Sequence, residues 1–219
     1  TIFTVNDLTF QQTYAFTVKA RDLAGNVSAA SNQITAEPLL QNLNYKYYTY
    51  VGSWPNLPDF TTLTPDATGV TPNVDISLAT QAENFAFLWE GFIIIPTSGT
   101  YQFRTTSDDG SKIWLGSLNG TTSPYSYGSA GIVNNDGLHG AVTVTSGSIS
   151  LTAGLYPIAI AYYNETGGQS MGLQWRTPST GTSYVTVPNS AFNDSPVSNG
   201  SAPADPTNLN AVAVSYKQI

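Results

Sequence analysis

Hydrophobic and polar residues alternate with a period of two over many short segments of this chain. Within Thr13–Ala20, the side chains of Tyr14, Phe16 and Val18 fall on the same face of an extended strand. The residues Asp22–Asn26 are typical of a turn, and Val27–Thr35 is predicted to be the returning strand. A lone hairpin is only marginally stable in water, so we expect this one to be part of a larger unit.

The middle of the chain holds a longer series of strand patterns. Turn residues separate them, for example Asp108-Asp109-Gly110 and Thr166-Gly167-Gly168. Many short strands with turns between them favour an all-β fold, either a sandwich or a barrel. The predicted strands are Tyr45–Tyr50, Phe85–Ile95, Gly99–Thr105, Ser111–Leu115, Gly140–Val144, Ser148–Leu151, Gly154–Tyr163 and Met171–Arg176.

Composition narrows the functions that such a fold could serve. The chain has 7 Lys and Arg residues against 14 Asp and Glu, and this net charge of −7 disfavours binding to nucleic acid or to an anionic membrane. It has no cysteine and 1 histidine, which removes disulfides and thiolate metal sites and disfavours a zinc site. The usual hydrolase and nucleotide-binding motifs do not occur, so we expect no enzyme activity in this chain.

Both ends of the chain resemble fibronectin type III domains. The run from Leu8 to Ser28 resembles the last strands of such a domain, with Tyr14 at the tyrosine-corner position, and Pro203–Leu209 resembles an opening strand. The predicted domain organisation is therefore residues 1–37 as the carboxyl-terminal strands of a fibronectin type III domain, 38–192 as a complete domain, 193–204 as a linker, and 205–219 as the first strand of a further fibronectin type III domain.

Several motifs of the central segment, in the right order, resemble the PA14 domain, which is named after the protective antigen of a bacterial toxin. They are Phe85–Phe92, Ile95–Phe103, Thr106–Gly116, Val133–His139 and Ser148–Glu165. The resemblance covers about residues 40–192. It implies an all-β fold, an antiparallel β-sandwich of the PA14 type, with partial fibronectin type III strands at both ends.

Asp108-Asp109-Gly110 has two interpretations. Asp-Gly favours a tight hairpin turn between the flanking strands. Alternatively, the two carboxylates share one hard cation such as calcium, which takes roughly six to eight oxygen ligands. Neighbouring side chains on an ordinary strand point to opposite faces, so convergence requires an unusual backbone such as a cis Asp–Asp bond. The resemblance implies the second interpretation, since sugar-binding PA14 domains hold calcium with such a pair.

The loop from Asn164 to Ser170 is the predicted second contributor, because its glycine pair allows backbone carbonyls to turn inward. An ordinary flexible hairpin loop is the alternative. In lectin-type PA14 domains the matching loop supplies calcium ligands and sugar contacts. By this resemblance the predicted calcium ligands are Asp108, Asp109, Asn164, Gly168 and Gln169, and the predicted sugar contacts are Asp108, Asp109, Gln169, Ser170 and Tyr163.

Aromatic side chains fall into two groups. The rings of Trp54, Tyr125, Tyr127 and Tyr163 are the candidates for stacking on a sugar. Trp89, Trp114 and Trp175 lie within strand patterns and are predicted to be core residues. The residues Asn134–His139 are interpreted as a turn that hydrogen-bonds its own backbone, with His139 in a structural role.

The resemblance implies a calcium-dependent carbohydrate-binding, lectin-like module of a multidomain adhesin or glycoside hydrolase. The expected cofactor is Ca²⁺, and the expected partner is a cell-surface glycan or polysaccharide, with fibronectin type III domains adjacent in the same chain. Neither nucleic-acid binding nor membrane insertion is expected. The composition is typical of a secreted or cell-surface bacterial protein. Two alternatives stay open, namely a structural or protein-interaction sandwich without ligand and an accessory domain of an enzyme.

Overall fold

The computed structural model describes residues 5, 13–36 and 42–194. The chain divides into two units, and each is described by itself. The predicted strand within residues 205–219 and most of the predicted linker lie outside the described residues. In the part of the chain that is described, no helix is long and apolar enough to cross a membrane.

Among residues 13–36, which belong to the smaller unit, β1 (Tyr14–Phe16) and β2 (Ile34–Ala36) form an antiparallel strand pair. The turn between them is held by the carboxylate of Asp22, which accepts hydrogen bonds from the backbone N and the Nδ2 of Asn26, both at 2.8 Å. The predicted hairpin is therefore confirmed, although both strands are shorter than predicted.

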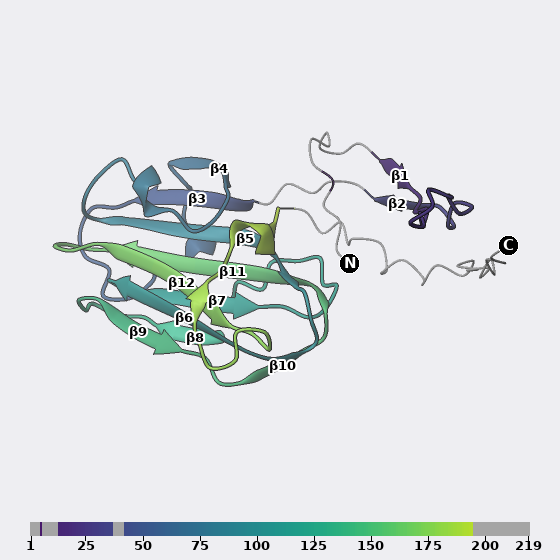
Figure 1. Cartoon of the computed structure of the whole chain (residues 1–219). Helices are drawn as coiled ribbons and strands as arrows, with labels where there is room; N and C mark the ends of the chain where they lie inside the picture. Colours follow the sequence, from purple (N-terminus) through teal and green to yellow (C-terminus); the bar gives the residue numbers. More distant parts are fainter. Residues whose placement is uncertain (1–4, 6–12, 37–41, 195–219) are drawn as a thin grey trace, which may run out of the picture. The chain divides into compact units, whose positions relative to one another are not determined.

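The larger unit is an antiparallel β-sandwich, as predicted (Figure 1). One sheet has seven strands in the order β4-β3-β5-β11-β7-β8, with β14 also paired to β5, and the other has five in the order β10-β6-β12-β13, with β9 also paired to β6. The elements are β3 (Leu43–Thr49), η1 (Phe60–Thr62), β4 (Ala67–Thr71), η2 (Ile76–Leu78), β5 (Phe85–Ile95), β6 (Gly99–Asp108), β7 (Ser111–Leu115), β8 (Val133–Asn135), β9 (Val142–Thr145), β10 (Ile149–Leu151), β11 (Gly154–Asn164), β12 (Ser170–Arg176), β13 (Val185–Thr186), η3 (Asn189–Ala191) and β14 (Phe192–Asn193).

The two faces of the seven-stranded sheet are both covered, which explains why β5 and β11 are hydrophobic without alternation. On its inner face Phe87 belongs to the cluster that joins the two sheets, together with Phe103 and Trp175 of the five-stranded sheet. In β6, by contrast, buried and partly exposed residues alternate, because only one face of that strand meets the core.

A second cluster packs on the outer face of the seven-stranded sheet, beneath the segment that contains η1. Its buried members include Leu57, Phe60, Trp114 and Tyr163. Trp89, Trp114 and Trp175 are all at most 5% exposed, so their prediction as core residues is confirmed. The outer cluster fixes the segment around residues 54–63 on the sheet.

The chain crosses from one sheet to the other at three places near one end of the sandwich. The turn 109–110 joins β6 to β7, the loop 136–141 joins β8 to β9, and the loop 165–169 joins β11 to β12. The strand registers bring these crossovers together, since Ser170 lies opposite Asp108 and Ser111 opposite Asn135. The turn at Asp108-Asp109-Gly110 is therefore not the hairpin of the first interpretation, because β6 and β7 belong to different sheets.

Both ends of the larger unit meet at the middle of β5. β14 pairs with Phe92 and Ile93 on the same edge of β5 that β3 occupies further along, opposite the edge taken by β11. The side chain of Asn44 donates a hydrogen bond to the carbonyl of Asp194 over 3.3 Å. The last strand thus reaches Asn193, one residue into the predicted linker.

Candidate metal centre

Asp108 ends β6, and Asp109 begins the crossover to β7. The peptide bond between them is cis, the backbone form that the resemblance implied. Asp108 is half-buried, whereas Asp109 is only 5% exposed. Gly110 follows with no room for a side chain, because an added Cβ would lie 2.5 Å from the ring of Tyr163 and 2.9 Å from the backbone N of Gly137.

The carboxylate of Asp109 ties two of the crossovers together. Its Oδ1 accepts a hydrogen bond from the backbone N of His139 over 3.0 Å, and its Oδ2 accepts one from the backbone N of Glu165 over 2.9 Å. Such bonds to a charged group stabilise the ionised carboxylate. They also fix its position relative to the loops 136–141 and 165–169.

Neither carboxylate has a basic partner within the described residues. The two ion pairs there are Lys46–Glu90 and Lys112–Asp136, each with a separation of 2.7 Å. Two neighbouring carboxylates, one of them buried, repel each other and lose hydration energy unless a cation compensates. The pair therefore has the electrostatics of a cation site.

Asn164 supplies a neutral oxygen beside this pair. It is the last residue of β11, fully buried, and its Nδ2 donates to the carbonyl of Ala82 over 3.1 Å. Its Oδ1 has no hydrogen-bond partner. A buried carbonyl oxygen without a partner costs free energy, so its presence next to Glu165 and Asp109 points to a ligand for that oxygen.

Gly168 lies against Asp108, on the half-buried side of the pair. A Cβ at this position would stand 2.7 Å from Oδ2 of Asp108, so a side chain would fill the space beside the carboxylate. The Oγ of Ser170, opposite Asp108 in the strand register, is also buried without a partner. Gln169 is exposed between them.

These residues fit calcium. The available atoms are carboxylate, amide and backbone oxygens, which are the ligands that this hard cation prefers. No cluster of three or more His, Cys, Asp or Glu side chains occurs in the described ranges, so the remaining ligands of a cation here would be neutral oxygens. Asp108, Asp109 and Asn164 carry side-chain oxygens of these kinds, and of the loop residues Gly168 lies against Asp108 while Gln169 is exposed.

Tyr162 and Tyr163 show that β11 supports the centre from beneath. The hydroxyl of Tyr162 donates to the carbonyl of Asp108 over 2.6 Å. Burial raises the pKa of this hydroxyl, and the carboxylates of Asp109 and Asp108 raise it further. Burial likewise raises the pKa of Tyr163, with added effects of Asp136 and Asp109.

Tyr163 does not fit its predicted role as a sugar contact. Its side chain is 0% exposed. Successive side chains of β11 point to opposite faces of the sheet, and that of Tyr163 points into the outer cluster beneath residues 54–63. A ring with no exposed surface cannot stack on a sugar. The predicted sugar contact at Tyr163 is therefore wrong, and this side chain is a packing residue beneath the centre.

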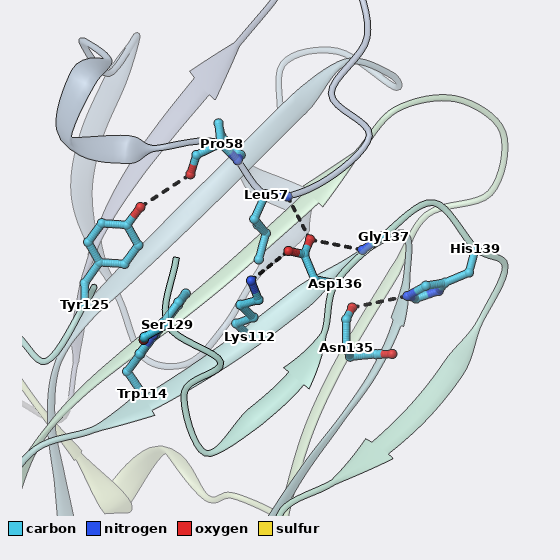
Figure 2. Close-up of polar contacts among 10 residues, drawn as sticks. All are labelled: Leu57, Pro58, Lys112, Trp114, Tyr125, Ser129, Asn135, Asp136, Gly137 and His139. Atoms are coloured by element: carbon cyan, nitrogen blue, oxygen red, sulfur yellow. Dashed lines mark hydrogen bonds and ion pairs between the residues drawn. The ribbon is translucent and has the colours of Figure 1, made fainter. Parts of the chain in front are cut away.

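A largely buried ion pair next to the centre was not foreseen from sequence. Figure 2 shows Asp136 between Lys112, 2.7 Å away, and the backbone N–H groups of Leu57 and Gly137 at 2.7 and 3.0 Å. His139 directs its Nε2 at the carbonyl of Asn135, 3.2 Å away (Figure 2). These contacts give Asp136 and His139 structural roles, as predicted for this turn.

Comparison with known proteins identifies the fold. A model of the PA14 domain family matches residues 42–189, more than half of the chain. The chain belongs to the PA14 domain family. A search of curated proteins finds no match.

Solved PA14 domains have the same fold. The PA14 domain of the MpAFP antifreeze protein has a TM-score of 0.55 and 19% identity, over 72% of this chain and 93% of the other. The PA14 sugar-binding domain from an RTX adhesin has a TM-score of 0.53 and 22% identity, over 71% and 99%. An anti-sigma factor domain-containing protein has a TM-score of 0.50 and 20% identity, over 70% and 47%.

Other aromatic residues of this PA14 domain also lie near the centre. Tyr50, which sequence reasoning did not select, donates from its hydroxyl to the carbonyl of Asn164 over 3.2 Å. Trp54 stacks on Tyr50 with ring centroids 3.7 Å apart. Tyr125 packs edge-on against Trp114 and is held in place, whereas Tyr127 is 59% exposed. Of the four candidate rings, Tyr163 is fully buried, Trp54 and Tyr125 are partly buried and pack against the outer cluster, and Tyr127 is exposed.

Proposed function

We propose that this PA14 domain is a calcium-dependent carbohydrate-binding module of a secreted or cell-surface protein. One observation carries the proposal. The carboxylates of Asp108 and Asp109 have no basic partner in the described part of the chain. Asp109 binds the backbone N of Glu165, and the preceding residue, Asn164, has a buried Oδ1 that lacks a hydrogen-bond partner. The RTX adhesin domain of the same fold, described as sugar-binding, supports it.

Different residues of the centre hold the cation and select the sugar. Asp108, Asp109 and Asn164 hold the cation, since they supply the charge and the buried amide oxygen. Calcium in a surface site keeps coordination positions that sugar hydroxyls can take. Gln169 is exposed at the rim, and with Ser170 it adjusts which sugar is preferred, while the backbone of Gly168 leaves space beside Asp108.

The module is proposed to be non-catalytic. The carboxylates of Glu90 and Asp136 are engaged in ion pairs with Lys46 and Lys112 and are not free to act as a general acid or base. In the full-length protein, an adhesin or a glycoside hydrolase, fibronectin type III domains on either side would act as spacers. We also propose that the protein is bacterial.

A glycan array with and without chelator tests the proposal. We expect calcium-dependent binding of low single-site affinity, because a shallow site excludes little water. The Gln169→Ala variant should bind calcium as the wild type does and change the ranking of glycans. The control variant Asp75→Asn, which removes one charge at the cap of η2, should keep the wild-type ranking.

Three results would count against the proposal. A glycan signal that persists in chelator would remove the role of calcium. Loss of calcium affinity in Gln169→Ala would contradict the division of roles. Calcium-independent stability together with no glycan signal would favour the alternative of a structural or accessory sandwich.

A further inference from the structure

A groove beside the candidate centre is lined by accessible aromatic and polar side chains. It has a volume of about 330 Å³ and includes Trp54, Asn56, Asp59, Thr62 and Tyr127 in its lining. None of these residues is a predicted calcium ligand. The volume lies at the lower end of the range of about 300–1,000 Å³ for small-molecule sites, so the groove suits one small ring rather than a long ligand.

The floor of the groove is fixed before any ligand arrives. The backbone N of Leu57 donates to Oδ1 of Asp136 over 2.7 Å (Figure 2). The hydroxyl of Tyr125 accepts from the backbone N of Phe60 over 3.0 Å and donates to the carbonyl of Pro58 over 3.4 Å. A groove held by such contacts loses little conformational entropy when a ligand binds.

Two chains of contacts link the groove to the candidate centre. On one side Trp54 stacks on Tyr50, whose hydroxyl binds the carbonyl of Asn164. On the other side Asp136 binds the backbone of both Leu57 and Gly137, and Gly137 packs against the Asp109–Gly110 turn. These contacts hold the groove and the centre in a fixed arrangement, at the two ends of a few bonded or packed groups.

The lining has the chemistry of a neutral sugar site. The rings of Trp54 and Tyr127 offer apolar faces, and Tyr127 is 59% exposed. The amide of Asn56 and the carboxylate of Asp59 offer donors and acceptors for hydroxyl groups. Oδ1 of Asp59 caps η1 through the backbone N of Thr61, which leaves Oδ2 for a ligand. The groove residues include a carboxylate and no Lys or Arg, so an anionic sugar is repelled.

We propose that this groove is a second saccharide subsite, which takes a neutral sugar unit adjacent to the unit bound at the Asp108–Asp109 centre. The domain accordingly prefers neutral oligosaccharides to monosaccharides and to glycans that carry uronic acid or sulfate. This inference rests on the proposed function, since the first unit is held by the calcium centre.

Titration calorimetry in excess calcium tests the subsite. The probes are glucose, galactose, mannose and fucose, together with neutral di- and trisaccharides that end in each of them. For a sugar that binds, we expect the oligosaccharide to bind the wild type about tenfold more tightly than the monosaccharide, which corresponds to about 1.4 kcal/mol. Trp54→Ala and Tyr127→Ala should each remove most of this difference and leave monosaccharide affinity unchanged.

The controls separate the subsite from the centre. Tyr184→Ala removes an aromatic ring that packs on Arg104 on the five-stranded sheet, and it should retain the tenfold difference. Trp54→Phe preserves a ring against Tyr50 and should retain part of it. Calcium affinity is measured for every variant without sugar.

The outcomes are distinct. Calcium-dependent monosaccharide binding with no gain for any oligosaccharide overturns the subsite and leaves the proposed function intact. An equal loss of monosaccharide and oligosaccharide affinity in both Trp54→Ala and Tyr127→Ala also overturns it, because these residues would then only support the centre. Calcium binding without any sugar binding by the wild type overturns the proposed function and the subsite together.

Discussion

Replacing Asp109 by Asn should abolish the response of the domain to calcium while the sandwich stays folded. The carboxylate is 5% exposed and accepts backbone hydrogen bonds at both oxygens, from His139 and Glu165. An amide keeps one acceptor and turns an NH₂ group toward the other backbone N–H. It also removes one of the two charges that a cation would neutralise.

The size of each effect follows from these contacts. Loss of one hydrogen bond to a charged group costs about 1.5–3 kcal/mol, and relief of the repulsion with Asp108 offsets part of that cost in the absence of calcium. Calcium at 100 times its Kd stabilises the wild type by about 2.7 kcal/mol. For a domain of this size, this corresponds to a rise in Tm of roughly 5–10 °C.

Calorimetric unfolding in calcium and in chelator measures both effects. The wild type and the charge-matched control Asp75→Asn should show the rise in Tm, since the Asp75 carboxylate caps η2 by accepting from the backbone N of Ser77. Asp109→Asn should show a modestly lower Tm that is the same in calcium and chelator. The reasoning is refuted if Asp109→Asn keeps the wild-type rise, because the carboxylate would then not contribute to the cation site.

Other features of the domain lead to measurable expectations. Trp175→Ala should lower the free energy of unfolding in urea by about 3–5 kcal/mol, because the indole is 5% exposed between the sheets; a loss below 1 kcal/mol would contradict that placement. Lys112→Ala should cost about 3–5 kcal/mol, since it leaves the Asp136 carboxylate buried without its partner, and the double variant with Asp136→Leu should recover part of the loss. The pKa values of Tyr162 and Tyr163 lie above the ordinary 10.0, so their contribution to stability is complete below pH 10.0 and is lost as the pH rises above it. An absorbance titration should therefore show these phenols ionising only with unfolding, and early ionisation of all tyrosines would oppose this expectation.

Much of the fold could be predicted because strand signals are local. Period-two alternation located β6 and β12, and the long apolar runs located β5 and β11. The strands β4 and β8 were missed, since β4 contains Gly69 and β8 contains Asn134 and Asn135, residues that disfavour strands on their own. Such strands form because a neighbour offers an edge for pairing, which no local pattern records.

The centre was predictable only where sequence neighbours share it. Asp108 and Asp109 are adjacent, so a motif could identify them. Tyr50 and Lys112 were missed because their partners are distant in sequence, Asn164 at the end of β11 and Asp136 in the loop after β8. The burial of Tyr163 likewise depends on the segment around residues 54–63. This segment has the sequence pattern of a loop, from which its packing on the sheet cannot be predicted.

The meeting of β3 and β14 at the middle of β5 has a mechanical consequence. The chain enters and leaves this domain at neighbouring points, where the side chain of Asn44 binds the carbonyl of Asp194. Tension applied along the chain would pass directly between these two points instead of stretching the sandwich. Force along the chain would therefore bypass most of the domain. The crossover end of the sandwich would keep its shape when shear flow stretches the chain.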